Sequence, residues 1–244
     1  MIDTHAHLDA LDDPSAAIAR ARDAGVDSIV AIGSGLESTR TTLELAARED
    51  GVHPAAGIHP HQAGDGESLE DLRRLVTDAV VAIGEIGLDF YRDYAPRDDQ
   101  RRVFEAQLEL AADLELPVIV HTRAAEEETM QILAGFDGTV VLHCFSSPAL
   151  LESASERGYY VSFAGNVTYP KAEDLREAAR RVHAHRILAE TDTPYLAPQP
   201  LRGRPNEPAN VVHTVAALAA ARAEDEQELG RRIVANAERA LRLP

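Results

Sequence analysis

Side chains that can bind metal ions recur along this chain at the ends of strand-like segments. His5 and His7 follow the short apolar start Met1-Ile2. In a β-strand, residues i and i+2 point to the same side, so both imidazoles can reach one metal ion. A His-x-His pair alone is weak evidence, because two hydrogen-bonded histidines are the commoner arrangement. Four further candidates follow later strand-like runs: Glu85, His121, His143 and Asp192. Without cations these side chains would repel one another or lack partners, so together they predict a metal centre.

Short apolar or β-branched runs, separated by helical patterns, must position these side chains. We expect strands at Ile2–His5, Ser28–Ile32, Ala55–Ile58, Val80–Ile83, Val118–His121, Thr139–His143, Tyr159–Phe163 and Ile187–Glu190. Asp13-Pro14 predicts the start of a helix that Gly25 ends, and Ser147-Pro148 predicts another that Gly158 ends. Strands that alternate with helices pair in parallel through right-handed crossovers. Eight such units in 244 residues predict a closed (β/α)8 TIM barrel.

The alternative fold is an open, doubly wound sheet. Its Gly-rich fingerprint is missing, because Gly33-Ser34-Gly35 has no third glycine at the required spacing. No linker or low-complexity segment interrupts the pattern, so we predict a single domain over residues 1–244. Barrel enzymes carry their chemistry at the C-terminal ends of the strands, and all six candidate ligands are therefore expected on one rim.

Composition limits the classes of protein to which the chain can belong. A hydrophobic content of 45% supports a full core, and 27% charged residues indicate a soluble surface. No apolar run approaches the roughly 18 residues of a membrane helix, and the N-terminus lacks the pattern of a signal peptide. Cys144 follows His143 in a predicted alternating strand, so its side chain is expected to point away from that histidine. It is the only cysteine, so no internal disulfide can form. We therefore predict a cytoplasmic protein, either a monomer or a weak oligomer, without a membrane partner.

The net charge of −17 argues against a partner that is a long polyanion. The chain has no broad basic stripe, but it has local arginines. These arginines are expected to cluster after the fourth, fifth and eighth strands: Arg92, Arg97, Arg101, Arg102, Arg123, Arg202 and Arg204. A compact basic site of this kind suits a frayed or single-stranded end better than a long duplex.

Six segments together carry a resemblance to a known family. They are Asp3-Thr4-His5-Ala6-His7-Leu8-Asp9, Gly57-Ile58-His59-Pro60-His61, Gly84-Glu85-Ile86-Gly87-Leu88-Asp89, Val120-His121-Thr122-Arg123, His143-Cys144-Phe145-Ser146 and Glu190-Thr191-Asp192-Thr193-Pro194-Tyr195-Leu196. Arg202-Gly203-Arg204 with Asn206-Glu207-Pro208 matches a further segment. With these motifs the chain resembles, nearly from end to end, the TatD family of metal-dependent deoxyribonucleases, within the amidohydrolase-like barrels.

The resemblance implies a barrel fold and hydrolysis of phosphodiester bonds in DNA. It also implies two divalent metal ions, for which zinc, manganese and magnesium are the candidates. The implied ligands of one ion are His5, His7, Glu85 and Asp192. Those of the other are Glu85, His121 and His143. Glu85 would thus bridge the two ions, and its neighbours Gly84 and Gly87 let the backbone approach closely.

Three positions depart from the family pattern. Ala124 stands where the family often has Asp, and Leu201 replaces a frequent His before Arg202. Ser147 replaces a glycine, and we expect it to cap the helix that starts at Pro148. None of these positions is a candidate ligand.

The predicted mechanism is two-metal hydrolysis of a phosphodiester. Asp192 is expected to accept the proton of the attacking water, with Glu85 as the second catalytic carboxylate. His59, His61 and Arg123 would position the phosphate, with Arg202 and Arg204 further out. His59 could instead orient a metal ligand, and Arg123 could form a salt bridge with Glu126, Glu127 or Glu128.

We predict a 3′–5′ exonuclease that acts on single-stranded or frayed DNA ends. The alternative is an amidohydrolase or an esterase on the same barrel, acting for example on aminoacyl groups. A non-catalytic metal-binding protein is disfavoured, because nearly every position of the motifs is intact.

Overall fold

The computed structural model describes residues 1–243, so the predicted domain end at Pro244 lies outside the described residues. All strands belong to one sheet, in which each strand pairs in parallel with the next one along the chain. The strands are β1 (Ile2–Ala6), β2 (Ser28–Gly33), β3 (Val52–Ala56), β4 (Ala82–Asp89), β5 (Val118–Arg123), β6 (Val140–Leu142), β7 (Tyr160–Phe163) and β8 (Ile187–Ala189).

The last strand returns to the first. Ala6 and Thr193 form a parallel bridge, and the His7 amide donates to the Thr193 carbonyl at 2.9 Å. The Asp192 amide donates to the His5 carbonyl at 3.0 Å, which ties the segment after β8 to β1. The sheet is thus a nearly closed barrel, and the predicted (β/α)8 architecture is confirmed.

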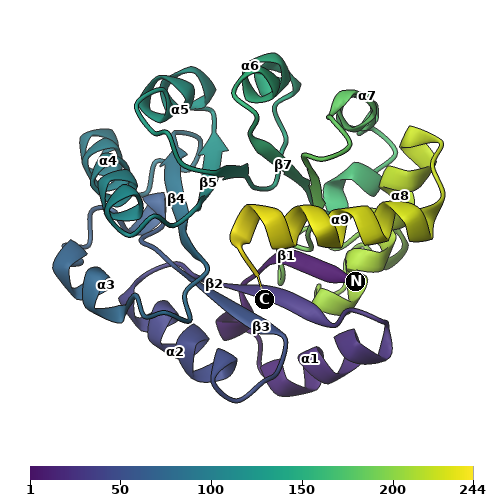
Figure 1. Ribbon diagram of the computed structural model, residues 1–244, viewed down its shortest axis with the longest axis horizontal. Coiled ribbons are helices and arrows are strands. Elements are labelled where there is room, and N and C mark those ends of the chain that lie inside the picture. The colour runs from purple at the N-terminus through teal and green to yellow at the C-terminus, as the bar shows by residue number, and fades with distance from the viewer. Residues whose placement is uncertain (244) are drawn as a thin grey trace.

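Helices surround the barrel as an outer ring (Figure 1). They are α1 (Pro14–Asp23), α2 (Leu36–Ala46), α3 (Leu69–Leu75), α4 (Arg97–Asp113), α5 (Glu126–Leu133), α6 (Leu151–Glu156), α7 (Glu173–Arg181), α8 (Val211–Arg222) and α9 (Glu226–Leu241). Helix α9 runs across the front of the barrel in Figure 1. Its Asn236 donates to the carbonyls of Ala184 and Ile187, where β8 begins. None of the described helices has the length and apolarity needed to cross a bilayer.

Of the two predicted N-terminal caps, Asp13 and Ser147, the structure contains only the first. Asp13 accepts a hydrogen bond from the Ala16 amide at 2.9 Å, and Pro14 is the first residue of α1, as predicted. Ser147 does not cap the helix that follows it. Its hydroxyl donates to the Glu126 carboxylate at 2.6 Å instead, so the predicted cap is wrong. A partner 21 residues earlier in the chain competes for this hydroxyl, and no local pattern shows that partner.

Strand β4 is longer than predicted, and this changes the position of Glu85. The predicted strand ends at Ile83, whereas β4 continues to Asp89, so Glu85 lies inside the strand. Glycines permit this continuation because β4 passes very close to β5. Gly87 has a φ of +135°, and a Cβ atom there would lie 2.0 Å from the His121 carbonyl oxygen. Only glycine fits such a contact, which confirms the predicted close approach beside Glu85.

Candidate metal centre

One oxygen of Glu85 faces a first group of candidate ligands at the barrel rim. Its Oε2 lies 3.4 Å from Nε2 of His5 and 3.4 Å from Nε2 of His7. These two nitrogens are 3.3 Å apart. Asp192 Oδ1 lies 3.9 Å from the His5 nitrogen and 3.7 Å from the His7 nitrogen. The end of β1, the residue after it, the middle of β4 and the segment after β8 thus bring these four donors close together.

The other oxygen of Glu85 faces a second group. Its Oε1 lies 2.8 Å from Nδ1 of His121, 2.9 Å from Nε2 of His143 and 3.4 Å from Nε2 of His59. Glu85 is almost fully buried, so these side chains replace water around it. Because its two oxygens contact different histidines, Glu85 has the arrangement of a bridging carboxylate.

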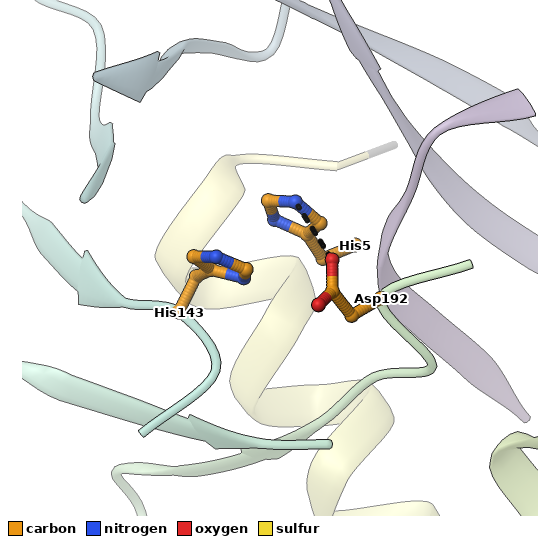
Figure 2. A group of neighbouring side chains, drawn as sticks. All are labelled: His5, His143 and Asp192. Carbon is orange, nitrogen blue, oxygen red and sulfur yellow. Dashed lines mark ion pairs between the residues drawn. The ribbon is translucent and has the colours of Figure 1, made fainter. Parts of the chain in front are cut away.

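Three groups of three side chains overlap at this site. Within each group, the donor atoms lie within 4.8 Å of one another, which is close enough to bind one ion. They are His5 with His143 and Asp192, His5 with His7 and Glu85, and His59 with Glu85 and His121. Figure 2 shows the first set, in which all three side chains point toward a common space. The set that contains His59 gives this residue a place among the candidate ligands as well as the predicted contact with phosphate.

The chemistry of these contacts fits a cation. Burial lowers the pKa of His5 to about 4, so its imidazole is neutral and has a free lone pair. Burial raises the pKa of Asp192 to about 6, against the attraction of His143 and His7. Burial alone would also raise the pKa of Glu85, but His143 and His59 hold it well below its usual range. Burial alone would lower the pKa of His143, but the attraction of Glu85 and Glu190 raises it well above its usual value. Buried carboxylates and imidazoles that face one another need protons or a metal ion between them.

Glu190 is a buried carboxylate that the sequence reasoning did not place in the site. Its Oε1 accepts from His143 Nδ1 at 2.9 Å and from the Cys144 amide at 2.7 Å. This leaves Nε2 of His143 directed at Glu85. Ligating histidines are usually oriented by an acceptor of this kind on the second nitrogen. The sequence contained a signal for this role, since Glu190 precedes Asp192 by two residues in the motif Glu190-Thr191-Asp192.

Two more acidic side chains, Asp89 and Asp3, lie close to the candidate ligands or to the segment that carries Asp192. Asp89 accepts from His61 Nε2 at 2.8 Å and from the Arg92 amide at 2.8 Å, and it lies 3.3 Å from His121 Nε2. Asp3 accepts from both the amide and the hydroxyl of Thr191, at 2.8 and 2.5 Å. Burial raises the pKa of Asp3 to about 8. Both residues belong to the family motifs given above, but His61, His121 and Thr191, which contact them, lie far away in the sequence.

A cavity of about 710 Å³ opens over the candidate metal-binding side chains. His59, His61 and Arg123 line it, as predicted for residues that position a substrate. Arg202 and Arg204 do not line it: Arg202 lies 4.0 Å from the ring of Tyr169, and Arg204 is exposed. The structure therefore places three of the five predicted substrate-binding residues at the cavity.

The expected cluster of seven arginines is smaller in the structure. Arg101 and Arg102 belong to α4 and pair with acidic residues, namely Glu128 and Asp98 for Arg101 and Asp99 for Arg102. Arg97 pairs with Asp93 at 3.2 Å. The cavity itself is lined by Arg92 and Arg123. Residues three or four positions away supply most of the acidic partners, and Glu128 comes from α5. This correction reduces the basic surface around the cavity.

Cys144 differs from its expected orientation. An alternating strand through Thr139–His143 would point it away from His143. The strand β6 ends at Leu142, and Cys144 has a φ of 45°, so alternation does not apply. Its side chain lines the same cavity as His143.

A family comparison agrees with this geometry. The model of the TatD-related DNase family matches residues 2–242. The chain belongs to this family. The predicted class, a metal-dependent hydrolase of the TatD type, is thereby confirmed.

Relatives of this TatD-family chain include proteins with and without a named activity. It is 40% identical over 224 residues to the uncharacterized metal-dependent hydrolase YcfH of Escherichia coli K12, covering 86% of this chain and 84% of that protein. It is 38% identical over 240 residues to the 3′-5′ ssDNA/RNA exonuclease TatD of Erwinia billingiae, covering 93% and 92%. The solved structure of the TatD homologue YjjV of Escherichia coli K12 superposes with a TM-score of 0.94 at 31% identity, covering 100% and 98%.

One of the departures from the TatD pattern lies at an unusual backbone position. Ala124 has a φ of 52°, in the left-handed region, directly after Arg123. Asp and Asn tolerate this conformation better than Ala does, because their side chains can bond to the local backbone. The Asp that the family often has here would therefore relieve the backbone as well as add a carboxylate near the cavity.

Proposed function

We propose that this TatD-family hydrolase binds two divalent cations and removes nucleotides from single-stranded DNA ends with 3′–5′ polarity. The observation that carries the proposal is the division of Glu85 between two groups of donors below a cavity lined by Arg92 and Arg123. A relative of similar length named as a 3′-5′ ssDNA/RNA exonuclease supports the polarity and the substrate.

We assign the proposed ligands to two ions according to the oxygen of Glu85 that each group of side chains faces. His5, His7, Glu85 and Asp192 would hold one ion, and Glu85, His121 and His143 the other. Zinc, manganese and magnesium remain the candidate metals, since imidazole and carboxylate ligands do not select among them. When bound, such ions lower the pKa of water and polarise a phosphoryl oxygen.

The chain's own residues then have distinct roles. Asp192 accepts the proton of the attacking water, and burial of its carboxylate makes it a stronger base than an exposed Asp. Glu190 and Asp89 orient the histidines beneath the reacting phosphate. Arg123, with His59 and His61, holds the phosphate, and the guanidinium can do so through two parallel hydrogen bonds. Arg202 and Arg204 would contact the strand further out.

The restriction to strand ends rests on charge. Within residues 1–243, neither Arg92 nor Arg123 has a carboxylate within 4.0 Å. By contrast, Arg97, Arg101 and Arg102 of α4 all form ion pairs with acidic side chains. Two available guanidinium groups contact few phosphates, and the net charge of −17 repels the backbone of a long duplex. We also propose a single domain over residues 1–244, because every strand belongs to one sheet. Location and oligomeric state stay predictions.

Digestion of linear and circular single strands tests this function. The linear strand, labelled at its 5′ end, should shorten stepwise from the 3′ end in the presence of Mn²⁺ or Mg²⁺. The circular strand of the same sequence should stay intact, as should both strands with the Asp192→Asn variant. Binding should have a shallow log–log salt slope of roughly −1.5 to −3, from two to four phosphate contacts at about −0.7 each.

Two outcomes would contradict the proposal. Rapid cutting of the circular strand, or a slope steeper than about −6, would show a long binding track. Faster hydrolysis of an amide or an aminoacyl ester than of any nucleic acid would favour the alternative class.

A further inference from the structure

Three tyrosines are exposed at the mouth of the metal centre. Tyr91, Tyr94 and Tyr195 expose 64%, 65% and 60% of their surface. Within residues 1–243 they are the large hydrophobic side chains with high exposure, and every phenylalanine is buried or half-buried. Tyr94 and Tyr195 line the cavity, and the ring of Tyr91 lies 4.1 Å from the guanidinium of Arg123, which also lines it. Exposed aromatic rings gathered at one cavity indicate a binding surface, because solvent-facing aromatics are otherwise scattered.

The tyrosines lie on two sides of the metal-binding side chains. Tyr91 and Tyr94 follow β4, and Tyr195 follows β8. In a barrel whose strands run in order from β1 to β8, these two positions are opposite one another. Tyr94 meets the ring of His61 edge-on at 4.8 Å, and Tyr195 meets the ring of His7 edge-on at 6.1 Å. The metal-binding histidines therefore lie between two aromatic platforms, each of which keeps an open face.

The platform after β4 also carries the available positive charge. The guanidinium of Arg92 lies 6.0 Å from the rings of both Tyr91 and Tyr94. An aromatic ring beside a guanidinium suits a nucleotide, since the ring stacks on the base and the cation attracts the phosphate. A neutral sugar, or a peptide without acidic groups, would use the rings but would leave these cations without an anion.

We propose that the two platforms hold the unpaired bases on either side of the scissile phosphate, one base on Tyr91 and Tyr94 and the other on Tyr195. This inference rests on the proposed nuclease function and adds the subsites that select single strands. Bases inside a duplex are stacked on their neighbours and cannot reach the rings. A single-stranded end can place one base on each platform while its phosphate lies over the metal centre.

The probe is a short oligodeoxynucleotide with phosphorothioate linkages, which slow hydrolysis, and with 2-aminopurine at the terminal or the penultimate position. Stacking on a ring quenches this base, so fluorescence reports both the affinity and the platform. Matched strands carry an abasic residue at one of the two positions. The variants are Tyr94→Leu and Tyr195→Leu, with Tyr94→Phe and Tyr195→Phe as controls that keep the ring.

Each Leu variant should bind the base-bearing strand about 5- to 150-fold more weakly, the range that loss of one stacked base produces. The same variant should bind the strand that is abasic at its own position as the unchanged protein does. The two Leu variants should respond to opposite positions, and the Phe variants should restore both affinity and quenching.

The inference is overturned if Leu and Phe variants bind alike, or if abasic strands lose as much affinity as base-bearing ones. The proposed nuclease function fails separately. Base-dependent binding without metal-dependent hydrolysis would refute that function and keep the platforms, whereas hydrolysis of single strands with binding that ignores the bases would do the reverse.

Discussion

Replacement of Glu190 provides a strong test of how the metal centre is built. Its Oε1 accepts two hydrogen bonds, from His143 Nδ1 at 2.9 Å and from the Cys144 amide at 2.7 Å, and the residue is fully buried. Burial alone would raise the pKa of Glu190, but the attraction of His143 and its hydrogen bond lower it, so the side chain is a carboxylate acceptor. The structure thus predicts two separate losses in Glu190→Ala.

The first loss concerns stability. One buried and one partly buried donor, at His143 and Cys144, would be left without an acceptor, and each costs about 1–3 kcal/mol. The free energy of unfolding should therefore fall by roughly 2–6 kcal/mol in Glu190→Ala. Glu190→Gln keeps an oxygen at the same place, so it should lose much less. Glu152→Ala, on the exposed side of α6, is a matched control for removal of a carboxylate.

The second loss concerns the metal. Without Glu190, His143 is free to turn, and loss of an orienting partner of this kind weakens metal affinity or activity by roughly 10- to 100-fold. Calorimetric titration with Mn²⁺, together with urea unfolding of the same samples, measures both quantities. Unchanged Mn²⁺ affinity in a folded Glu190→Ala variant would refute the view that this carboxylate positions a ligand.

Three further results are expected. Glu85→Ala should lower the metal content of gel-filtered protein from two ions per chain to at most one, whereas His59→Ala should retain two; equal content in both would show that Glu85 is not a bridge. Removal of metal by a chelator should lower the melting temperature, because an ion at 100 times its dissociation constant stabilises the fold by about 2.7 kcal/mol per site; an unchanged melting temperature after verified removal would count against a structural contribution. Burial lowers the pKa of His53 below its usual value, so the folded protein binds this proton less readily than the unfolded chain does. His53 therefore contributes to the free energy of unfolding above the usual histidine pKa, and this contribution is lost as the pH falls below it. Between about pH 7.5 and 5, His53→Gln should lose less free energy of unfolding than the unchanged protein. An equal loss in urea titrations would contradict this role of His53.

Much of the architecture was predictable because it depends on local periodicity. Apolar runs that alternate with helical patterns predict parallel strands, and the C-terminal ends of parallel strands meet at one edge. This is why the six candidate ligands, from five separate segments, could be placed on one rim before any contact was known. The structure brings together His5, His7, Glu85, His121, His143 and Asp192 as expected, while their role as ligands stays a proposal.

Predictions that depended on where a strand stops were weaker. The predicted fourth strand stopped at Ile83, although the close approach of β5 lets β4 continue through Gly87 to Asp89. The same kind of error turned Cys144 away from the cavity, because β6 stops one residue before His143. The end of a strand is decided by its neighbours in the sheet, which a single segment does not contain.

By itself, the sequence determined the barrel, the candidate ligand types and their shared rim, since these follow from the periodicity within segments and from the alternation of strands and helices along the chain. Only the tertiary structure decided which oxygen of Glu85 faces which histidine, and that Glu190 accepts from His143 across 47 residues of chain. It also decided that Arg101 is paired while Arg123 remains available beside Tyr91. The physical reason is that hydrogen bonds, ion pairs and stacking act over a few ångströms between segments, and closure of the barrel sets those distances.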